Sequence, residues 1–253
     1  MSAKTIIAWC THTANFWMGC CKVSPGCQNC YAETLTRNRM GLALWGPART
    51  TARQPVKGVY ANLRQWNKAS DPANPSKVFV GSLMDWAESH PDLDAIRPKI
   101  WDAIRDNDRL IFQLLTKRSE RVAALLPDFW PEIRHRVWLG VSIENADYAH
   151  RADDIRHLDS AVRFISYEPA LGPLADALCL TGIDWVIVGG ESGPGYRPID
   201  LQWARDMRAC CDAAGVAFFW KQGAAYRTEM HTQLDGETVR NYPIPRIPLA
   251  TTE

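Results

Sequence analysis

Short, mostly apolar runs recur along the 253-residue chain and alternate with amphipathic stretches. Such runs are typical of β-strands that are buried on both faces. Strands that alternate with helices predict parallel pairing with crossover connections. We therefore expect an α/β fold, an incomplete (β/α) barrel of about six to seven mostly parallel strands. The predicted strands cover residues 5–9, 78–81, 110–115, 137–142, 162–166, 185–189 and 217–220.

Helical patterns lie between these runs, at residues 31–40, 92–106, 119–126 and 200–215. In the last of them Asp200 is a predicted N-cap and Gly215 lies just past the end. We expect one domain over residues 1–253, with a basic insertion at about 37–75 and an irregular tail at about 224–253.

Composition narrows the class of protein. The chain is 46% hydrophobic and 23% charged, and no apolar run approaches the roughly 20 residues of a membrane span. Nothing at the N-terminus resembles a signal peptide. These features predict a cytoplasmic protein with no membrane partner. Thiols stay reduced there, so eight cysteines favour metal binding or redox chemistry over disulfides.

Charge is unevenly distributed, although the net charge is only +1. Residues 1–70 contain nine Lys or Arg and a single acid, Glu33. Cations interleaved with aromatic residues favour a nucleic-acid partner, and we take Arg49, Arg53 and Lys57 as candidate phosphate contacts. The alternative is a solvated basic face with aromatic residues in the core.

Polar residues or glycine follow nearly every predicted strand. The carboxyl ends of parallel strands share one edge of the sheet, where α/β proteins place their sites. The alternative is that these residues only form turns and helix caps. We expect one pocket. Its candidate residues are Ser82, Asp85, Lys117, Ser142, Glu144, Asn145, Glu168, Gly189, Gly190 and Glu191.

A cysteine loop follows the first predicted strand and reads GCCKVSPGCQNCYAE over residues 19–33. Three thiolates and one open position suit an iron–sulfur cluster with one iron free to bind a ligand. A structural zinc prefers four closed ligands, and adjacent Cys20 and Cys21 are poorly placed to share one ion. Zinc, with His12 as a further ligand, remains the alternative.

A CxxC with a third cysteine upstream resembles the radical S-adenosylmethionine (SAM) enzymes. Across most of residues 5–222 the chain is similar to the phage Gp37/Gp68-like family of radical-SAM-like three-cysteine proteins. The motifs that carry this resemblance are GCCKVSPGCQNCYAE, QLLTKRSER, VWLGVSIEN, RFISYEPALGPL, IDWVIVGGESGPGYRP and FFWKQ. In the family register Cys20, Cys27 and Cys30 are the cluster ligands, and Cys21 takes a variable place. The spacing Cys-x6-Cys-x2-Cys is longer than the common radical SAM spacing.

The resemblance implies a 4Fe–4S cluster that reductively cleaves SAM to a 5′-deoxyadenosyl radical, with electrons from an external donor. The radical would abstract hydrogen from the substrate. It also implies that the pocket residues contact SAM, with Lys117 and Arg118 as the best carboxylate partners. The basic segment then favours DNA or a nucleotide as the substrate. We expect an isomerase or lyase that rearranges a modified nucleobase in phage DNA; no catalytic residue is assigned. The alternative is a non-catalytic zinc- or iron–sulfur-binding protein that binds nucleic acid.

Overall fold

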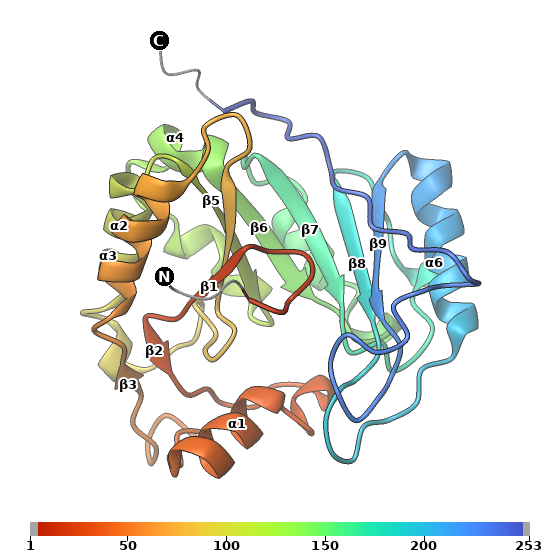
Figure 1. Ribbon diagram of the computed structural model, residues 1–253, viewed down its shortest axis with the longest axis horizontal. Helices are drawn as coiled ribbons and strands as arrows, with labels where there is room; N and C mark the ends of the chain where they lie inside the picture. The colour runs from red at the N-terminus through yellow and green to blue at the C-terminus, as the bar shows by residue number, and fades with distance from the viewer. Residues whose placement is uncertain (1–4, 250–253) are drawn as a thin grey trace.

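The computed structural model describes residues 5–249, and its central feature is one curled sheet (Figure 1). Within these residues seven strands follow the order β1-β4-β5-β6-β7-β8-β9, and every neighbouring pair is parallel. The sheet forms an open half-barrel, which confirms the predicted fold class. Its strands are β1 (His12–Ala14), β4 (Ser76–Val80), β5 (Leu110–Thr116), β6 (Val137–Ser142), β7 (Val162–Tyr167), β8 (Trp185–Gly189) and β9 (Ala217–Gln222). A separate antiparallel pair joins β2 (Trp17–Met18) to β3 (Gln54–Pro55).

Helices cover the outer face of the half-barrel, whereas the first helix, α1 (Tyr31–Met40), lies beyond the carboxyl ends of the strands (Figure 1). The larger hydrophobic cluster joins the outward side chains of the strands to Leu63, Ile100 and Ala204 on the helices. The outer helices are α2 (Val59–Ala69), α3 (Arg97–Asp106), α4 (Trp130–Ile133), α5 (Arg151–Ile155) and α6 (Leu201–Ala214).

The inner face changes from apolar to polar along each strand. On β7 the side chains alternate between faces, so that Phe164 joins the smaller, inner hydrophobic cluster while Ser166 and Glu168 line a cavity. On β9 the corresponding pair is Phe219 and Lys221. An aromatic layer therefore closes the amino-terminal half of the barrel, and polar side chains line its carboxyl end.

Gly140 on β6 shows how tightly this inner layer is packed. A Cβ added at Gly140 would meet the ring of Phe164 at 2.2 Å. The missing side chain therefore gives the ring its place in the barrel interior.

The structure confirms six of the predicted strands within a residue or two, but the first prediction is wrong. Residues 5–9 form turns, and the edge strand is β1, at His12–Ala14. Trp9 packs instead on the inner face, with its ring centroid 4.6 Å from that of Phe79. The apolar run at 5–9 therefore marks core packing rather than a strand.

The predicted helices at 31–40 and 200–215 are confirmed as α1 and α6. Asp200 accepts a hydrogen bond from the Gln202 amide at 2.8 Å, and Gly215 adopts a left-handed conformation. The helix predicted at 92–106 begins only at Arg97. The prediction at 119–126 is wrong, because two 3₁₀ turns form there and Leu126, which precedes Pro127, is extended.

The basic insertion predicted at about 37–75 contains the end of α1, then β3 and α2. The tail predicted at about 224–253 lies along the edge of β9 over its described part, where the Asn241 amide donates to Phe218 O at 3.1 Å. Residues 1–4 and 250–253 lie outside the described residues. Across residues 5–249, no helix is both long and apolar enough to cross a lipid bilayer.

Candidate functional site

The cysteine loop crosses the carboxyl end of the half-barrel and leads into α1. Gly19 has a φ of 109°, and a Cβ there would meet Leu44 O at 2.5 Å, so the turn before Cys20 requires glycine. Cys27 ends the 3₁₀ turn Pro25–Cys27, and Cys30 is the residue that precedes α1. The loop thereby spreads its cysteines along the edge of the sheet.

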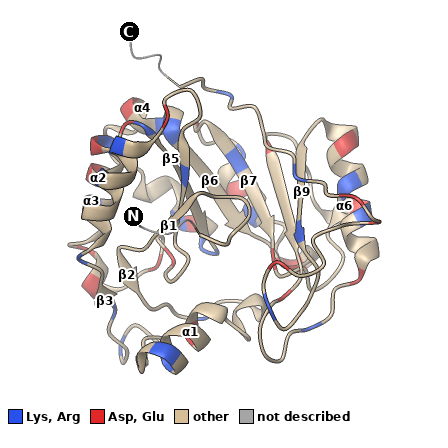
Figure 2. Cartoon of the chain, viewed as in Figure 1, with Lys and Arg blue, Asp and Glu red and all other residues tan. Residues whose placement is uncertain are grey.

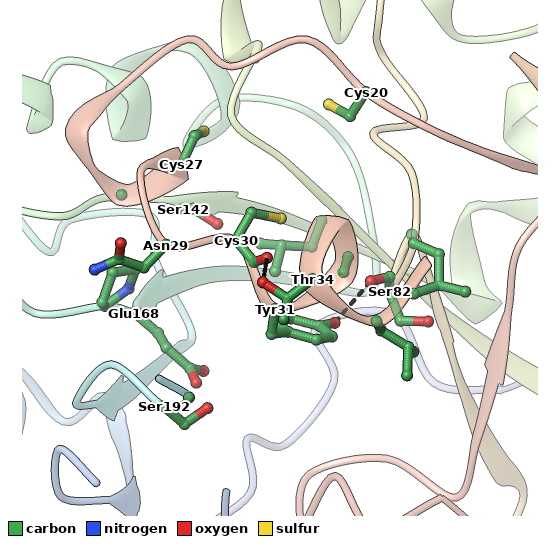
Figure 3. A pocket seen from close by; sticks show the side chains of 18 of the residues that line it. Cys20, Cys27, Asn29, Cys30, Tyr31, Thr34, Ser82, Ser142, Glu168 and Ser192 are labelled. Carbon is green, nitrogen blue, oxygen red and sulfur yellow. Dashed lines mark hydrogen bonds between the residues drawn. The ribbon is translucent and has the colours of Figure 1, made fainter. Parts of the chain in front are cut away.

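Cys20, Cys27 and Cys30 all line one cavity of about 840 Å³, and their side chains border the same open space (Figure 3). Cys21 lines it too, but its half-buried side chain donates from Sγ to Lys22 O at 3.7 Å. Within residues 5–249 all cysteines are free, and no three His, Cys, Asp or Glu side chains are grouped closely enough to hold a single metal ion.

The surroundings of the Cys20 thiol oppose its ionisation. Burial, with the nearby Asp85 carboxylate, raises the pKa of its thiol, and the Arg118 guanidinium partly opposes this effect. Nη1 of Arg118 lies 3.7 Å from Cys20 Sγ. Burial also raises the pKa of Cys30. Both groups are therefore neutral thiols near neutral pH, and a metal would have to displace their protons.

The predicted pocket residue Asp85 is held by residues at the end of β5. It accepts hydrogen bonds from Thr116 Oγ1 at 2.6 Å and from Arg118 Nη1 at 2.6 Å. Ser82 lines the cavity as well, and its hydroxyl accepts from Asn15 Nδ2 at 2.8 Å. Asp85 and Arg118 therefore form an ion pair beside Cys20.

Glu144 is fully buried beneath the cysteine loop. Its carboxylate lies 2.8 Å from Lys117 Nζ and 2.9 Å from Arg151 Nη1, and it accepts from Ser24 Oγ at 2.6 Å. Burial raises the pKa of this carboxyl, but Lys117 and Arg151 outweigh burial and hold it below its ordinary value. Glu144 is not among the residues that line the cavity. Its carboxylate is bound by the cysteine loop and by two cations, and its predicted contact with SAM stays a prediction.

The inner wall of the cavity carries polar groups from β6, β7 and β9. Ser142 and Ser166 are paired across β6 and β7 and are almost fully buried. Glu168 forms an ion pair with Lys221, and both side chains line the cavity. Ser166 and Lys221 are not among the predicted contacts. The sequence does contain a signal for them. In RFISYE and AFFWKQ every second side chain points to the inner face, so Ser166 lies on the same face as Phe164, and Lys221 on the same face as Phe219.

The loop after β8 borders the far side of the cavity. Gly190 lines it, and a Cβ there would meet the Ala224 backbone nitrogen at 2.3 Å. Glu191 lines it too but binds Arg197, whose Nε lies 2.9 Å from Glu191 Oε2. Gly189 packs against the Glu168 side chain. Gly190 and Glu191 therefore border the cavity, whereas Gly189 is not among its lining residues.

Asn145 lies away from the cavity lining. Its side chain accepts from the Asp147 amide at 3.1 Å and so caps a 3₁₀ turn. This is the capping role that polar residues after strands often have. In this structure the Asn145 side chain is a cap, and its predicted contact with SAM stays a prediction.

The three cations predicted to contact nucleic acid do not lie together on the surface. Arg49 and Lys57 are exposed but do not line the cavity. Arg53 is only 3% exposed and binds Glu88 through Nε at 3.0 Å and Nη2 at 2.8 Å. This burial contradicts the predicted phosphate contact of Arg53. A different cation, Arg39 near the end of α1, lines the cavity and is exposed. Figure 2 shows Lys and Arg positions on α1 in blue.

Several large apolar side chains that are exposed lie around the mouth of the cavity. Tyr226 is 64% exposed, Tyr31 49% and Ile6 70%, and all three line the cavity. Trp45, in the loop after α1, lines it as well. We call Tyr31, Trp45 and Tyr226 the aromatic rim.

Comparison with known proteins yields a family but no characterised relative. Neither the curated proteins nor the solved structures contain a match to this chain. A family model described as "Protein of unknown function (DUF5131)" matches residues 4–243. That match covers the cysteine loop, the seven strands of the half-barrel and the aromatic rim, and the chain therefore belongs to the DUF5131 family.

Proposed function

We propose that this protein is a radical SAM enzyme, with a 4Fe–4S cluster held by Cys20, Cys27 and Cys30. One observation carries the proposal: these three thiols border a single cavity of about 840 Å³ at the carboxyl end of a parallel half-barrel. This is the end at which α/β folds assemble their sites. A cavity of this size also leaves room for a nucleoside-sized ligand.

The chemistry of the donor set fits the cluster. Thiolates are the ligands that iron–sulfur clusters use, and three of them leave one iron open to a further ligand. A cluster of four irons also spaces its thiolates more widely than one tetrahedral ion does. The fit therefore does not require three sulfur atoms to converge on a single point. When bound, the cluster and SAM would supply a 5′-deoxyadenosyl radical, and the protein would supply geometry and exclude water.

Several lining residues of this chain are suited to bind SAM. The Glu168 carboxylate and the Lys221 ammonium are adjacent and offer an acceptor and a donor to the amino and carboxylate groups of the methionine moiety. The Ser142 and Ser166 hydroxyls on the inner wall are suited to ribose oxygens. Gly190, where a side chain would not fit, lets backbone approach a flat base.

The mouth of the cavity supports a nucleobase of DNA as the substrate. Tyr31, Trp45 and Tyr226 offer ring faces on which an exposed base can stack, and Arg39 offers a partner for phosphate. This set replaces Arg49, Arg53 and Lys57 as the proposed substrate contacts. A base lifted out of its strand could enter a pocket that a duplex cannot. The proposed outcome is rearrangement of a modified base, as an isomerase or lyase would catalyse.

The test is anaerobic reconstitution with iron and sulfide. We expect a brown protein that contains about four irons per chain and that forms 5′-deoxyadenosine from SAM when it is reduced. A colourless protein that binds one zinc per chain and leaves SAM intact would contradict the proposal and favour a non-catalytic zinc module.

A further inference from the structure

The cysteine loop is attached to the half-barrel through three carboxylates in the loops that follow β4, β6 and β8. They are Glu88, Glu144 and Glu191, and we call them the anchor carboxylates. Their exposed fractions are 1%, 0% and 6%. Each binds a cation on one side and the cysteine loop on the other. Buried carboxylates require such partners, because an unpaired buried charge is strongly unfavourable.

Glu88 holds the backbone next to Cys20. Its Oε1 accepts from the Cys21 amide at 2.9 Å, while Arg53 donates to both carboxylate oxygens. Arg118 Nη2 donates to the Cys21 carbonyl oxygen at 2.8 Å. Both backbone polar groups of Cys21 are thus bound by charged side chains. These contacts fix the orientation of the peptide that carries the Cys20 side chain.

Glu144 holds the middle of the loop. Ser24 donates to it at 2.6 Å, and Gly26 lies so close that an added Cβ would meet Glu144 Oε1 at 2.5 Å. The carboxylate cannot retreat easily, because Lys117 and Arg151 bind it from the other side. The backbone of Gly26 therefore packs directly against the Glu144 carboxylate. Because Gly26 immediately precedes Cys27, this contact also restricts the position of Cys27.

Glu191 holds the last part of the loop. Its Oε2 accepts from Asn29 Nδ2 at 3.0 Å, next to Cys30. Its partner Arg197 donates through Nη2 to Pro25 O at 3.1 Å. Burial raises the pKa of Glu191, but its hydrogen bonds with Arg197 and Asn29 outweigh burial and keep it low. The Glu191 carboxylate is thus ionised near neutral pH and binds both Asn29 and Arg197.

We propose that Glu88, Glu144 and Glu191 are positioning residues that fix the three cysteines before any metal binds. Each anchor acts next to a different cysteine, and each belongs to a different loop of the half-barrel. The alternative is that these groups are ordinary buried ion pairs that stabilise the whole fold. The proposal rests on the proposed function only in taking the cluster as the group that the loop receives.

The test measures the metal-free, reduced protein under anaerobic conditions. Amide hydrogen exchange of residues 19–30 measures how well ordered the loop is. The alkylation rates of Cys20, Cys27 and Cys30 measure how accessible their thiols are to solvent. Exposed Cys179 serves as an internal standard. We expect Glu88→Gln, Glu144→Gln and Glu191→Gln each to accelerate exchange about tenfold or more next to its own cysteine, a factor equivalent to about 1.4 kcal/mol. Exchange in β6, β7 and β8 should accelerate by a smaller factor than exchange in the loop.

Two matched controls accompany these variants. Glu33→Gln removes an ion pair with Lys22 at the surface of the same region, and it should leave loop exchange unchanged. Gly26→Ala keeps every charge but introduces the contact with Glu144, and it should accelerate exchange around Cys27. Gly58→Ala, where a Cβ meets nothing within 4 Å, should not. If a Gln variant does not fold, Gly26→Ala still decides the question.

Two outcomes would overturn the proposal. One is a loop that exchanges as fast in the wild type as in the variants, since it would then not be ordered without metal. The other is a uniform acceleration over the whole chain, which identifies general stabilisation instead. Iron content after reconstitution is recorded separately. A wild-type protein whose loop is protected but which binds no iron would support the role of the anchor carboxylates and contradict the proposed iron–sulfur cluster.

Discussion

Glu144 accepts a hydrogen bond from the hydroxyl of Ser24 at 2.6 Å, which links the end of β6 to a loop 120 residues earlier. From the sequence, Glu144 and the cysteine loop are two separate parts of one pocket. In the structure the carboxylate supports the loop from below and does not line the cavity. Charged residues at strand ends therefore divide into those that hold the loop and those that remain accessible to a ligand.

The buried environment of Glu144 predicts a specific pH dependence of stability. Lys117 and Arg151 hold the pKa of Glu144 below its ordinary value of 4.5, so the ionised form stabilises the folded state above that pH. This contribution is lost as the pH falls below 4.5 and passes through the lower pKa of the folded state. Glu144→Gln should lower the global free energy of unfolding near neutral pH, but by less than it lowers the local stability of the cysteine loop. Urea unfolding should show that the difference from wild type shrinks in acid; a constant difference would refute this role.

The register of the cysteines predicts which thiols bind the cluster. Cys20→Ala, Cys27→Ala and Cys30→Ala should each abolish cluster binding, because only three ligands are available. Cys21→Ala should retain it, since Glu88 and Arg118 bind the Cys21 backbone and not its side chain. Iron content after anaerobic reconstitution measures the effect. Iron retained in Cys20→Ala and lost in Cys21→Ala would reverse the assignment.

The aromatic rim predicts how the protein binds single-stranded DNA. Tyr226→Ala should weaken binding of a short oligonucleotide by about 1–3 kcal/mol if a base stacks on the ring. Tyr226→Phe keeps the ring and should bind as well as the wild type. Fluorescence anisotropy measures both affinities. Equal affinities for all three proteins would exclude stacking at this position.

Charge at the rim makes a separate prediction. Arg39→Ala should lower the magnitude of the log–log slope of affinity against salt by about 0.7, the value for one phosphate contact on a single strand. Lys57→Ala is the matched control, because Lys57 is exposed but does not line the cavity. Titrations at several salt concentrations give both slopes. A larger change for Lys57→Ala than for Arg39→Ala would assign the phosphate contact to Lys57 instead.

Packing in the barrel interior predicts the effect of a single methyl group. Gly140→Ala should destabilise the protein by about 1–3 kcal/mol, because the Cβ would overlap the Phe164 ring at 2.2 Å. Gly58→Ala should change stability by no more than about 0.5 kcal/mol, since the space around Gly58 is open. Chemical denaturation compares the two variants. Equal midpoints would show that the inner layer is loosely packed.

The hydrophobic pattern predicts most of the sheet because its strands are buried on both faces and are therefore apolar throughout. It does not predict β1, whose three residues His12–Ala14 carry little apolar signal. The neighbouring run at residues 5–9 is more apolar, since Trp9 fills the barrel interior. The local hydrophobic pattern shows which residues are buried. Burial alone does not distinguish a strand from a turn that packs into the core.

The candidate site is predictable in its location but not in its pairings. Strand ends converge at one edge, so the cavity can be anticipated from parallel topology. Which charges meet is set by contacts between distant segments, such as Arg53 with Glu88, and these leave no periodic signal. For the same reason the sequence assigns Arg53 to the surface, although its guanidinium is buried.

The central claim is that Cys20, Cys27 and Cys30 hold a cluster that activates SAM. The most direct measurement is the yield of 5′-deoxyadenosine after anaerobic incubation of the reconstituted protein with SAM and dithionite, determined by mass spectrometry. We predict that the wild type and Cys21→Ala form 5′-deoxyadenosine, and that the three ligand variants form none. An iron-loaded wild type that leaves SAM intact, or a chain that binds only zinc, would contradict the account.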